Sequence, residues 1–425
     1  MNDRFPGKPK ADLLIVGAAE VLTCVSAPGD PIGRRSGITI AVAGEQIIAV
    51  GTPAEVAEQV DSKGAQVLDA AGKVVAPGFI DGHTHLIFGG TRAREYAARM
   101  TRGAEEVKAM GIPTGIQATM AMTRAASADE LLVSASQRLG RMFRCGTTTV
   151  ESKSGYGLTL EDELKMLKVS RQLQISQPVD VLSTFLGAHD FPPDCPRDRY
   201  IEIVIQEMIP RVAEERLAVF CDVYCDDGYY DVSESRRILQ VGLDWGMKAK
   251  IHVDAYADIH GSFMAAELPV ISADHLNYTP PAAMRALAQA GVIGVVMPAL
   301  DFAVAHPRPF DARALMAEGT TLALATDLCP GCWTESMQIV MQLACRLYRF
   351  SPEEALLAST VSAAHALDLD DRGSLEPGKL ADIQIWDLPS FEELIYRIGN
   401  NSVESVIKRG EVFHFEDSHH DRTDR

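Results

Sequence analysis

Eight short apolar runs recur along the chain, and segments with helical spacing separate most of them. The length and composition of these runs are typical of buried strands. Strands that alternate with helices form parallel sheets, and eight such units in one stretch favour a closed barrel over an open sheet. We therefore expect an α/β fold with a TIM-type (β/α)8 barrel, whose strands are predicted at 73–80, 147–151, 179–186, 219–224, 248–252, 270–274, 292–297 and 321–326.

The two ends of the chain differ in style from this middle part. Short strand-like runs at 12–16, 37–42 and 46–50 are broken by Gly and Pro turns, and similar runs return at 382–386 and 403–412. This pattern indicates a small β unit at each end. We expect the ends to meet in one discontinuous β-sandwich domain, residues 1–73 plus 370–425, beside a barrel domain of residues 74–369. The polar segment 416–425 is expected to fray.

Ionisable side chains stand where the predicted barrel strands end. In a barrel of this type the functional residues gather at the carboxyl ends of the strands. The first strand leads to two histidines, and only the seventh, at Pro298, lacks an ionisable group. The residues concerned are His83, His85, Glu151, His189, Asp226, Asp227, His252, Asp254, Asp274, His275 and Asp327.

Four of these residues form a candidate metal site. His83 and His85 are two residues apart, so on a strand both imidazoles face the same side. His252 and Asp327 add a third imidazole and a carboxylate. Three imidazoles and one carboxylate suit Zn²⁺ or Fe²⁺ and do not suit Ca²⁺ or Mg²⁺. We therefore predict one divalent metal, Zn²⁺ (or Fe²⁺).

The same set predicts hydrolytic chemistry. A metal of this kind lowers the pKa of a bound water to about 7, which provides hydroxide at neutral pH. Asp327 is placed to take the proton of that water and to pass it to a leaving nitrogen. His275 is placed to polarise the carbonyl that is attacked. The alternative for His275 is a buried, hydrogen-bonded structural histidine.

Composition excludes several classes of partner. The formal net charge is −18 and the sequence pI about 5.1, whereas nucleic acids and anionic membranes bind basic surfaces. We expect no nucleic-acid or membrane partner. No signal-peptide pattern opens the chain, so we expect a cytoplasmic location. Cys329 and Cys332 form a Cys-x-x-Cys pair, but neither a thioredoxin-like unit nor a second pair accompanies it, so a redox or structural-zinc role is not favoured.

These motifs together resemble the amidohydrolase superfamily and, within it, the imidazolonepropionases. The signature Pro-Gly-Phe-Ile-Asp-x-His-x-His carries the superfamily resemblance. The runs Lys-Ser-Gly-Tyr-Gly and Phe-Leu-Gly-Ala-His carry the resemblance to the imidazolonepropionases. Matching segments extend over nearly the whole chain, at 77–92, 123–127, 150–158, 184–189, 250–252 and 272–276.

The resemblance implies roles for three pocket residues. Arg92 matches an arginine that binds the propionate group of the substrate, and a planar guanidinium is suited to bidentate carboxylate binding. Tyr156 matches a tyrosine that contacts the substrate, and His189 a histidine that lines its ring. Without the resemblance, a surface salt bridge for Arg92 and a core position for Tyr156 would be favoured. The resemblance also implies a homodimer.

The chain departs from the family pattern at three places. Ala255 stands where the family has Glu or Gln, three residues after the barrel histidine. Cys329 stands where the family has Asn, and the glycine-rich segment 111–116 also differs. A pocket that loses hydrogen-bonding groups changes which ligands it accepts. The metal chemistry does not depend on these positions.

The resemblance implies hydrolysis of a five-membered cyclic amide, either 4-imidazolone-5-propanoate, giving N-formimino-L-glutamate in histidine degradation, or a related carboxylate-bearing heterocycle. The first alternative is deamination of an amino-heterocycle by the same hydroxide, which would release ammonia. A relative that binds metal without turnover is a second alternative. A nucleotide-cofactor enzyme is disfavoured, because Gly155-Tyr156-Gly157 lacks the third glycine of a dinucleotide fingerprint.

Overall fold

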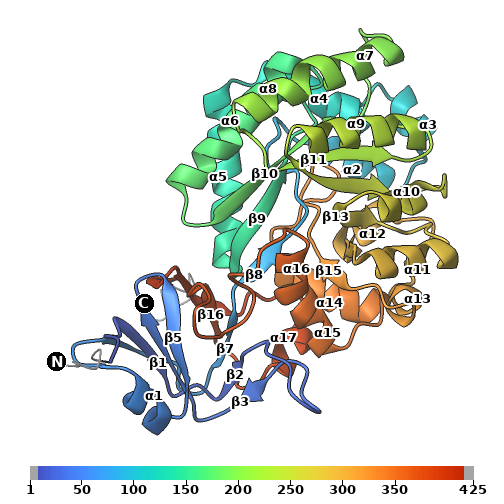
Figure 1. Ribbon diagram of the computed structural model, residues 1–425. Coiled ribbons are helices and arrows are strands. Elements are labelled where there is room, and N and C mark those ends of the chain that lie inside the picture. Colours follow the sequence, from blue (N-terminus) through green and yellow to red (C-terminus); the bar gives the residue numbers. More distant parts are fainter. Residues whose placement is uncertain (1–7, 416–425) are drawn as a thin grey trace, which may run out of the picture.

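The computed structural model describes residues 8–415 and divides them into a barrel and a two-sheet unit (Figure 1). The barrel occupies the upper part of the view, and both chain ends lie at the lower unit. Within the described residues, no helix has the length and apolar character needed to cross a membrane.

The barrel contains eight parallel strands in sequential order, which confirms the predicted fold class. The predicted runs from 147 onward each coincide with one of these strands. The strands are β8 (Phe79–Asp81), β9 (Thr147–Lys153), β10 (Asp180–Ala188), β11 (Phe220–Cys225), β12 (Lys248–Val253), β13 (Val270–His275), β14 (Ile293–Val296) and β15 (Leu322–Leu324).

Residues that follow β8 and β15 close the barrel. Thr84 forms a parallel bridge with Leu328. The amide of Asp327 donates to the carbonyl of His83 at 3.1 Å, and the amide of His85 donates to Leu328 at 2.9 Å. The seam between the first and last strands therefore runs through three of the predicted metal ligands.

Helices cover the outside of the barrel and extend over its upper end (Figure 1). The residues at their starts follow capping rules. Before α15, for example, Ser351 is the N-cap residue, Pro352 is the first helical residue, and Ser351 and Glu354 form a capping box. The helices are α2 (Ala93–Arg99), α3 (Ala104–Ala109), α4 (Gly115–Ala125), α5 (Ala128–Arg144), α6 (Leu160–Ser176), α7 (Arg197–Ile203), α8 (Ile209–Glu214), α9 (Val232–Asp244), α10 (Gly261–Glu267), α11 (Pro281–Ala290), α12 (Pro298–Val304), α13 (Ala312–Ala317), α14 (Met337–Leu347), α15 (Pro352–Ala358) and α16 (Val361–His365), with a π-helical turn at Val204–Met208 between α7 and α8.

Both ends of the chain build the second unit, as predicted. Its first sheet has the order β5-β4-β1-β6 and its second the order β18-β17-β16-β7-β2-β3. Apolar side chains from both sheets, among them Ile15, Ile40, Val75 and Ile383, form one buried cluster between them. The elements are β1 (Leu13–Val16), β2 (Glu20–Leu22), β3 (Arg34–Arg35), β4 (Thr39–Ala43), β5 (Gln46–Gly51), α1 (Pro53–Gln59), β6 (Gln66–Asp69), β7 (Val74–Pro77), β16 (Ile383–Trp386), α17 (Glu392–Tyr396), β17 (Val403–Lys408) and β18 (Glu411–His414).

The run 73–80, predicted as one barrel strand, is divided between the two units. Its first half, β7, pairs with β16 and β2 of the second sheet, and its second half, β8, enters the barrel. Gly78 lies at the division, where a Cβ atom would stand 2.4 Å from the Thr148 side chain. The apolar pattern could not reveal this division, because both halves are buried.

The run 403–412 is likewise two strands and not one, since a turn at 409–410 makes β17 and β18 an antiparallel hairpin. The domain limits 1–73 plus 370–425 and 74–369 stay a prediction. The expected frayed tail, 416–425, lies outside the described residues.

A buried ion cluster joins the two units. Asp180, at the start of β10, accepts from Arg372 at 2.5 Å, from Lys408 at 2.9 Å and from Arg409 at 3.1 Å. Burial alone would raise the pKa of Asp180, but Lys408 and Arg372 outweigh it and lower that pKa below its ordinary value. The carboxylate therefore stabilises the folded chain above a pH of about 4, the ordinary pKa of Asp.

We predict that Asp180→Asn lowers the free energy of unfolding at pH 7 by about 3 kcal/mol, because it leaves the buried cations of Arg372 and Lys408 with fewer partners. Urea unfolding measures the loss. The difference from wild type should shrink as the pH falls below about 4, because there Asp180 takes up a proton in the unfolded chain while its lowered pKa keeps it ionised in the folded one. Asp371→Asn, which removes a more exposed partner of Arg372, is the control. A difference that widens in acid would contradict this account.

Candidate metal centre

The predicted ligands meet inside the barrel, at the carboxyl ends of its strands. The ring centroids of His83 and His85 are 5.6 Å apart, and His252 lies 4.5 Å from His83 and 5.6 Å from His85. A carboxylate oxygen of Asp327 lies 3.7 Å from Nε2 of both His83 and His85. All four residues are almost fully buried. The structure thus brings together the set that the sequence predicted.

Several donor atoms of these residues have no protein partner. Among the described residues, His83 Nε2, His85 Nδ1, His252 Nε2 and Asp327 Oδ1 are buried without a hydrogen bond. Unsatisfied buried polar atoms are costly and rare, and two of these, His83 Nε2 and Asp327 Oδ1, lie 3.7 Å apart. Potential ligand atoms of His83, His85 and Asp327 all lie within 4.8 Å of one another. The residues present therefore fit a bound divalent metal.

Two aspartates set the tautomers of the ligand histidines. Asp274 Oδ2 lies 2.6 Å from His83 Nδ1, and Asp222 Oδ2 lies 3.0 Å from His252 Nδ1. A carboxylate next to Nδ1 favours the proton on that nitrogen and leaves Nε2 free to bind metal. Each aspartate therefore orients one histidine toward the centre.

Lys153 links these two aspartates. Its ammonium lies 2.7 Å from Asp222, 2.9 Å from Glu151 and 3.5 Å from Asp274, and the side chain is fully buried. Burial alone would lower the pKa of Lys153, but Asp222 and Glu151 outweigh it and raise that pKa. Lys153 therefore keeps its charge and fixes both aspartates.

Burial sets the protonation of the centre. It lowers the pKa of His83, His85 and His252 well below the ordinary value, so these imidazoles are neutral at pH 7. Burial raises the pKa of Asp327 to about 7, with Lys153 acting in the opposite direction. Asp81, which accepts from Thr326, has its pKa raised to about 7 for the same reason. Neutral imidazoles are the form that binds metal.

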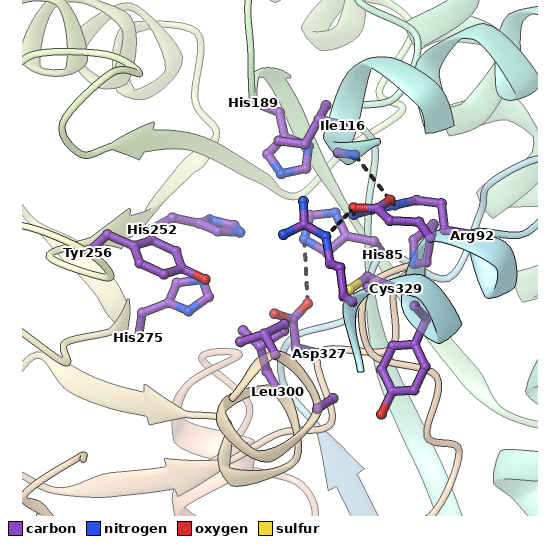
Figure 2. A pocket seen from close by; sticks show the side chains of 18 of the residues that line it. His85, Arg92, Ile116, His189, His252, Tyr256, His275, Leu300, Asp327 and Cys329 are labelled. Atoms are coloured by element: carbon purple, nitrogen blue, oxygen red, sulfur yellow. Dashed lines mark hydrogen bonds and ion pairs between the residues drawn. The ribbon is translucent and has the colours of Figure 1, made fainter. Parts of the chain in front are cut away.

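A cavity of about 690 Å³ opens onto the centre, and Figure 2 shows its labelled lining residues around Asp327. The predicted substrate-binding residues Arg92, Tyr156 and His189 all line it, as does His275. His189 Nδ1 lies 3.1 Å from the Gly155 carbonyl, which favours an unprotonated Nε2 on its other side. Gly155 has φ +107°, and a Cβ there would stand 2.9 Å from His189.

Arg92 is partly engaged by a residue that the sequence did not single out. Glu95 accepts from Arg92 Nε at 2.6 Å and from Nη2 at 3.1 Å, and it also accepts from Arg99 Nε at 2.9 Å. This pairing positions the guanidinium at the cavity wall. The sequence did carry a signal for this pairing, because Arg92, Glu95 and Arg99 are spaced three and four residues apart and so share one helical face.

Three further tyrosines of the cavity were also missed. Tyr224 and Tyr229 stack with ring centroids 4.0 Å apart, and Tyr256 lies at the loop after β12. Tyr224 stands in a strand-like run and reads as a core residue, and Tyr229 and Tyr256 stand in polar segments without a motif, so the sequence carried no clear signal for them. Lys153 and Asp222 could have been noticed as charged residues within apolar strands.

The positions that depart from the family pattern have different surroundings. Ala255 is buried, and its carbonyl lies 3.0 Å from His306 Nε2. Cys329 lines the cavity. Its backbone forms reciprocal hydrogen bonds with Cys332, and among residues 8–415 no cluster with metal-ligand geometry contains a cysteine. Asp226, left open by the sequence, accepts from the backbone of Tyr256 and Asp227 and thus supports this loop.

Comparison with known proteins agrees with the fold. Models of the amidohydrolase family match residues 247–413 and 66–112. An adenosine deaminase from Xanthomonas campestris, solved with bound zinc, superimposes with a TM-score of 0.66 at 21% identity over 95% of this chain and 93% of its own. An atrazine chlorohydrolase from Arthrobacter aurescens TC1, complexed with zinc, gives 0.69 at 18% identity over 94% of each chain. At such identities the likeness shows the fold alone. Fold and donor set define a metal-dependent amidohydrolase.

Closer relatives narrow the class. The imidazolonepropionase of Shouchella clausii (strain KSM-K16) is 40% identical over 417 residues, 95% of this chain and 93% of the relative. That of Geobacillus thermodenitrificans (strain NG80-2) is 45% identical over 372 residues, 86% of this chain and 87% of the relative. The chain belongs to the imidazolonepropionase family.

We predict different consequences for two neighbouring histidines. His252→Ala should lose metal and activity together, because it removes a ligand. His275→Ala should keep the metal while turnover falls about a hundredfold to a thousandfold, the usual effect of removing a group that stabilises the transition state. Metal content after gel filtration and kcat measure the two effects. The rings of both residues lie within 5.5 Å of His83, so equal metal loss in the two variants would contradict the separate roles.

We also predict that Lys153→Met weakens metal binding about tenfold to a hundredfold, because Asp222 and Asp274 lose the cation that fixes them. Competition with a chromogenic chelator measures the affinity. Lys250→Met is the comparison, since this second buried lysine donates to the backbone carbonyls of Gly82 and Ala366 and lies 3.5 Å from Glu151, but has no hydrogen bond to Asp222 or Asp274 among the described residues. Both variants should unfold at a lower temperature than wild type. If Lys153→Met and Lys250→Met bind the metal with equal affinity, the positioning role of Lys153 is ruled out.

Proposed function

We propose that the chain hydrolyses the lactam C–N bond of 4-imidazolone-5-propanoate and gives N-formimino-L-glutamate, a step of histidine degradation. One observation carries the proposal: unpartnered metal-ligand atoms and Arg92 border the same cavity in a chain of the imidazolonepropionase family. A carboxylate-bearing ring needs both features, one to cleave the amide and one to bind the acid.

The metal is proposed to be Zn²⁺ (or Fe²⁺), held by His83, His85, His252 and Asp327. Neutral imidazoles and a carboxylate are its usual ligands in hydrolytic sites. When bound there, it supplies hydroxide at neutral pH by lowering the pKa of a water to about 7.

Asp327 and His275 handle the protons and the carbonyl. Asp327 would take a proton from the attacking water and return it to the ring nitrogen as the C–N bond breaks. A molecule of water is thereby added across the amide. Burial lowers the pKa of His275 to about 4, so its ring is neutral at pH 7 and can donate one N–H to the carbonyl oxygen.

Arg92 is proposed to bind the propanoate group. Glu95 holds its Nε and Nη2 edge, which leaves Nη1, near Gly331, for the ligand. Tyr156 and His189 contact the ring. The ring of His189 stacks on that of His85 at 4.7 Å, which places it next to the metal ligands.

The test is turnover of freshly generated 4-imidazolone-5-propanoate by the metal-loaded protein, followed as loss of the ultraviolet absorbance of the ring. We predict rapid loss, with product identified as N-formimino-L-glutamate. His83→Ala is the control, because it keeps the cavity lining but lacks a ligand, and it should show no loss above the buffer rate.

Two outcomes would contradict the proposal. Stoichiometric metal without ring loss would show that the cavity accepts another heterocycle. Release of ammonia from an amino-heterocycle, with no action on the lactam, would identify the chain as a deaminase that uses the same centre.

A further inference from the structure

The loop after β12 directs a tyrosine into the cavity. Figure 2 shows the ring of Tyr256 reaching inward on the side of His252 and His275. The residue is 47% exposed and lines the cavity. Within residues 8–415 no hydrogen bond engages its hydroxyl, whereas its backbone amide donates to Asp226 at 2.8 Å. The hydroxyl is therefore available to a ligand.

The surroundings fix the direction of this ring. On one side it packs against His306, with centroids 4.9 Å apart, and His306 Nε2 lies 3.0 Å from the Ala255 carbonyl. Asp226, which follows β11, accepts a hydrogen bond from the backbone amide of Tyr256 and so fixes the backbone at that residue. A side chain held at its backbone and on its ring face loses little conformational freedom when it binds a ligand, which makes a specific contact effective.

The neighbouring wall selects a flat ring. Tyr224 and Tyr229 stack at 4.0 Å with an interplanar angle of 27°, and both line the cavity beside Tyr256. Aromatic walls of this kind bind planar rings in offset-stacked or edge-to-face arrangements. A ligand held against them presents its ring edge to the hydroxyls around it.

The phenol of Tyr256 acts as a donor at neutral pH. Burial raises its pKa to about 12, and the carboxylates Asp301 and Asp327 add to this shift. The hydroxyl therefore keeps its proton throughout the physiological range. The pocket would therefore bind more tightly a ligand whose ring edge carries a hydrogen-bond acceptor.

We propose that Tyr256 is a specificity-determining residue whose hydroxyl donates a hydrogen bond to an acceptor on the substrate ring, either an unprotonated ring nitrogen or a second carbonyl oxygen. This inference rests on the proposed function and deepens it. The substrate class is a planar five-membered cyclic amide that carries a carboxylate arm and a further acceptor beside the amide. A lactam with methylene groups at that edge would leave the hydroxyl without its partner and bind more weakly.

Two ligands isolate this contact. Hydantoin-5-propanoate has a second carbonyl beside the amide, whereas 2-oxopyrrolidine-3-propanoate has methylene groups there. Calorimetry of the metal-loaded protein gives both dissociation constants, and the recovered ligand is checked for ring opening. We expect wild type to prefer the hydantoin by about tenfold, and Tyr256→Phe to reduce that preference to about twofold or less.

Tyr278→Phe is the matched control. Tyr278 also lies near His306, at 6.2 Å between ring centroids, but is not among the residues that line the cavity. This variant should keep the wild-type preference. Metal content and unfolding temperature, measured for both variants, show that each is folded and loaded.

Turnover of 4-imidazolone-5-propanoate adds a second readout. Tyr256→Phe should raise KM about fivefold to tenfold and leave kcat within about twofold, because the contact serves binding more than chemistry. An unchanged ligand preference in Tyr256→Phe would overturn the role of Tyr256, whatever the reaction is. If wild type binds neither ligand, the substrate class is wrong. If it binds them with the expected preference but does not open imidazolonepropanoate, Tyr256 keeps its role and the proposed reaction fails.

Discussion

The buried ion network inside the barrel is the constraint on which the site depends. Glu151, Asp222 and Asp274 surround Lys153 where neither water nor surface counter-ions reach. Breaking one partner of such a network leaves an uncompensated buried charge, which is strongly destabilising. Because the same aspartates contact His83 and His252, the charges that hold the barrel interior together also orient the metal ligands.

Acidic side chains outnumber basic ones in and around this network, and two of the additional carboxyl groups, those of Asp81 and Asp327, lie at the candidate metal centre. Asp81 and Asp327 both have their pKa raised to about 7, first by burial and then by neighbouring carboxylates. A divalent cation at this point would offset that excess and keep Asp327 ionised. His83, His85 and Asp327 also lie on the two sides of the barrel seam, so a metal bound by them would join the first strand to the last.

Chemistry and recognition occupy different parts of the cavity. The candidate metal ligands stand at strand ends, and backbone hydrogen bonds across the seam fix His83, His85 and Asp327. Arg92 at the start of α2 and Tyr256 in the loop after β12 stand on connecting segments, which tolerate substitution more readily than strands do. Ala255 and Cys329 fall among these segments. The fold thus allows the accepted ring to vary while the hydrolytic centre stays the same.

The sequence by itself determined the barrel and the two-ended β unit and predicted the four candidate ligands, because hydrophobic periodicity and the position of a residue at a strand end are local properties. Only the tertiary structure decided that 73–80 belongs to two sheets, since both halves are equally buried. Only it showed that Glu95 holds Arg92, that Lys153 joins two aspartates far apart in the chain, and that Tyr256 faces the cavity and not the core. Each of these contacts depends on which side chains meet across different strands and loops, and no local sequence pattern encodes such contacts.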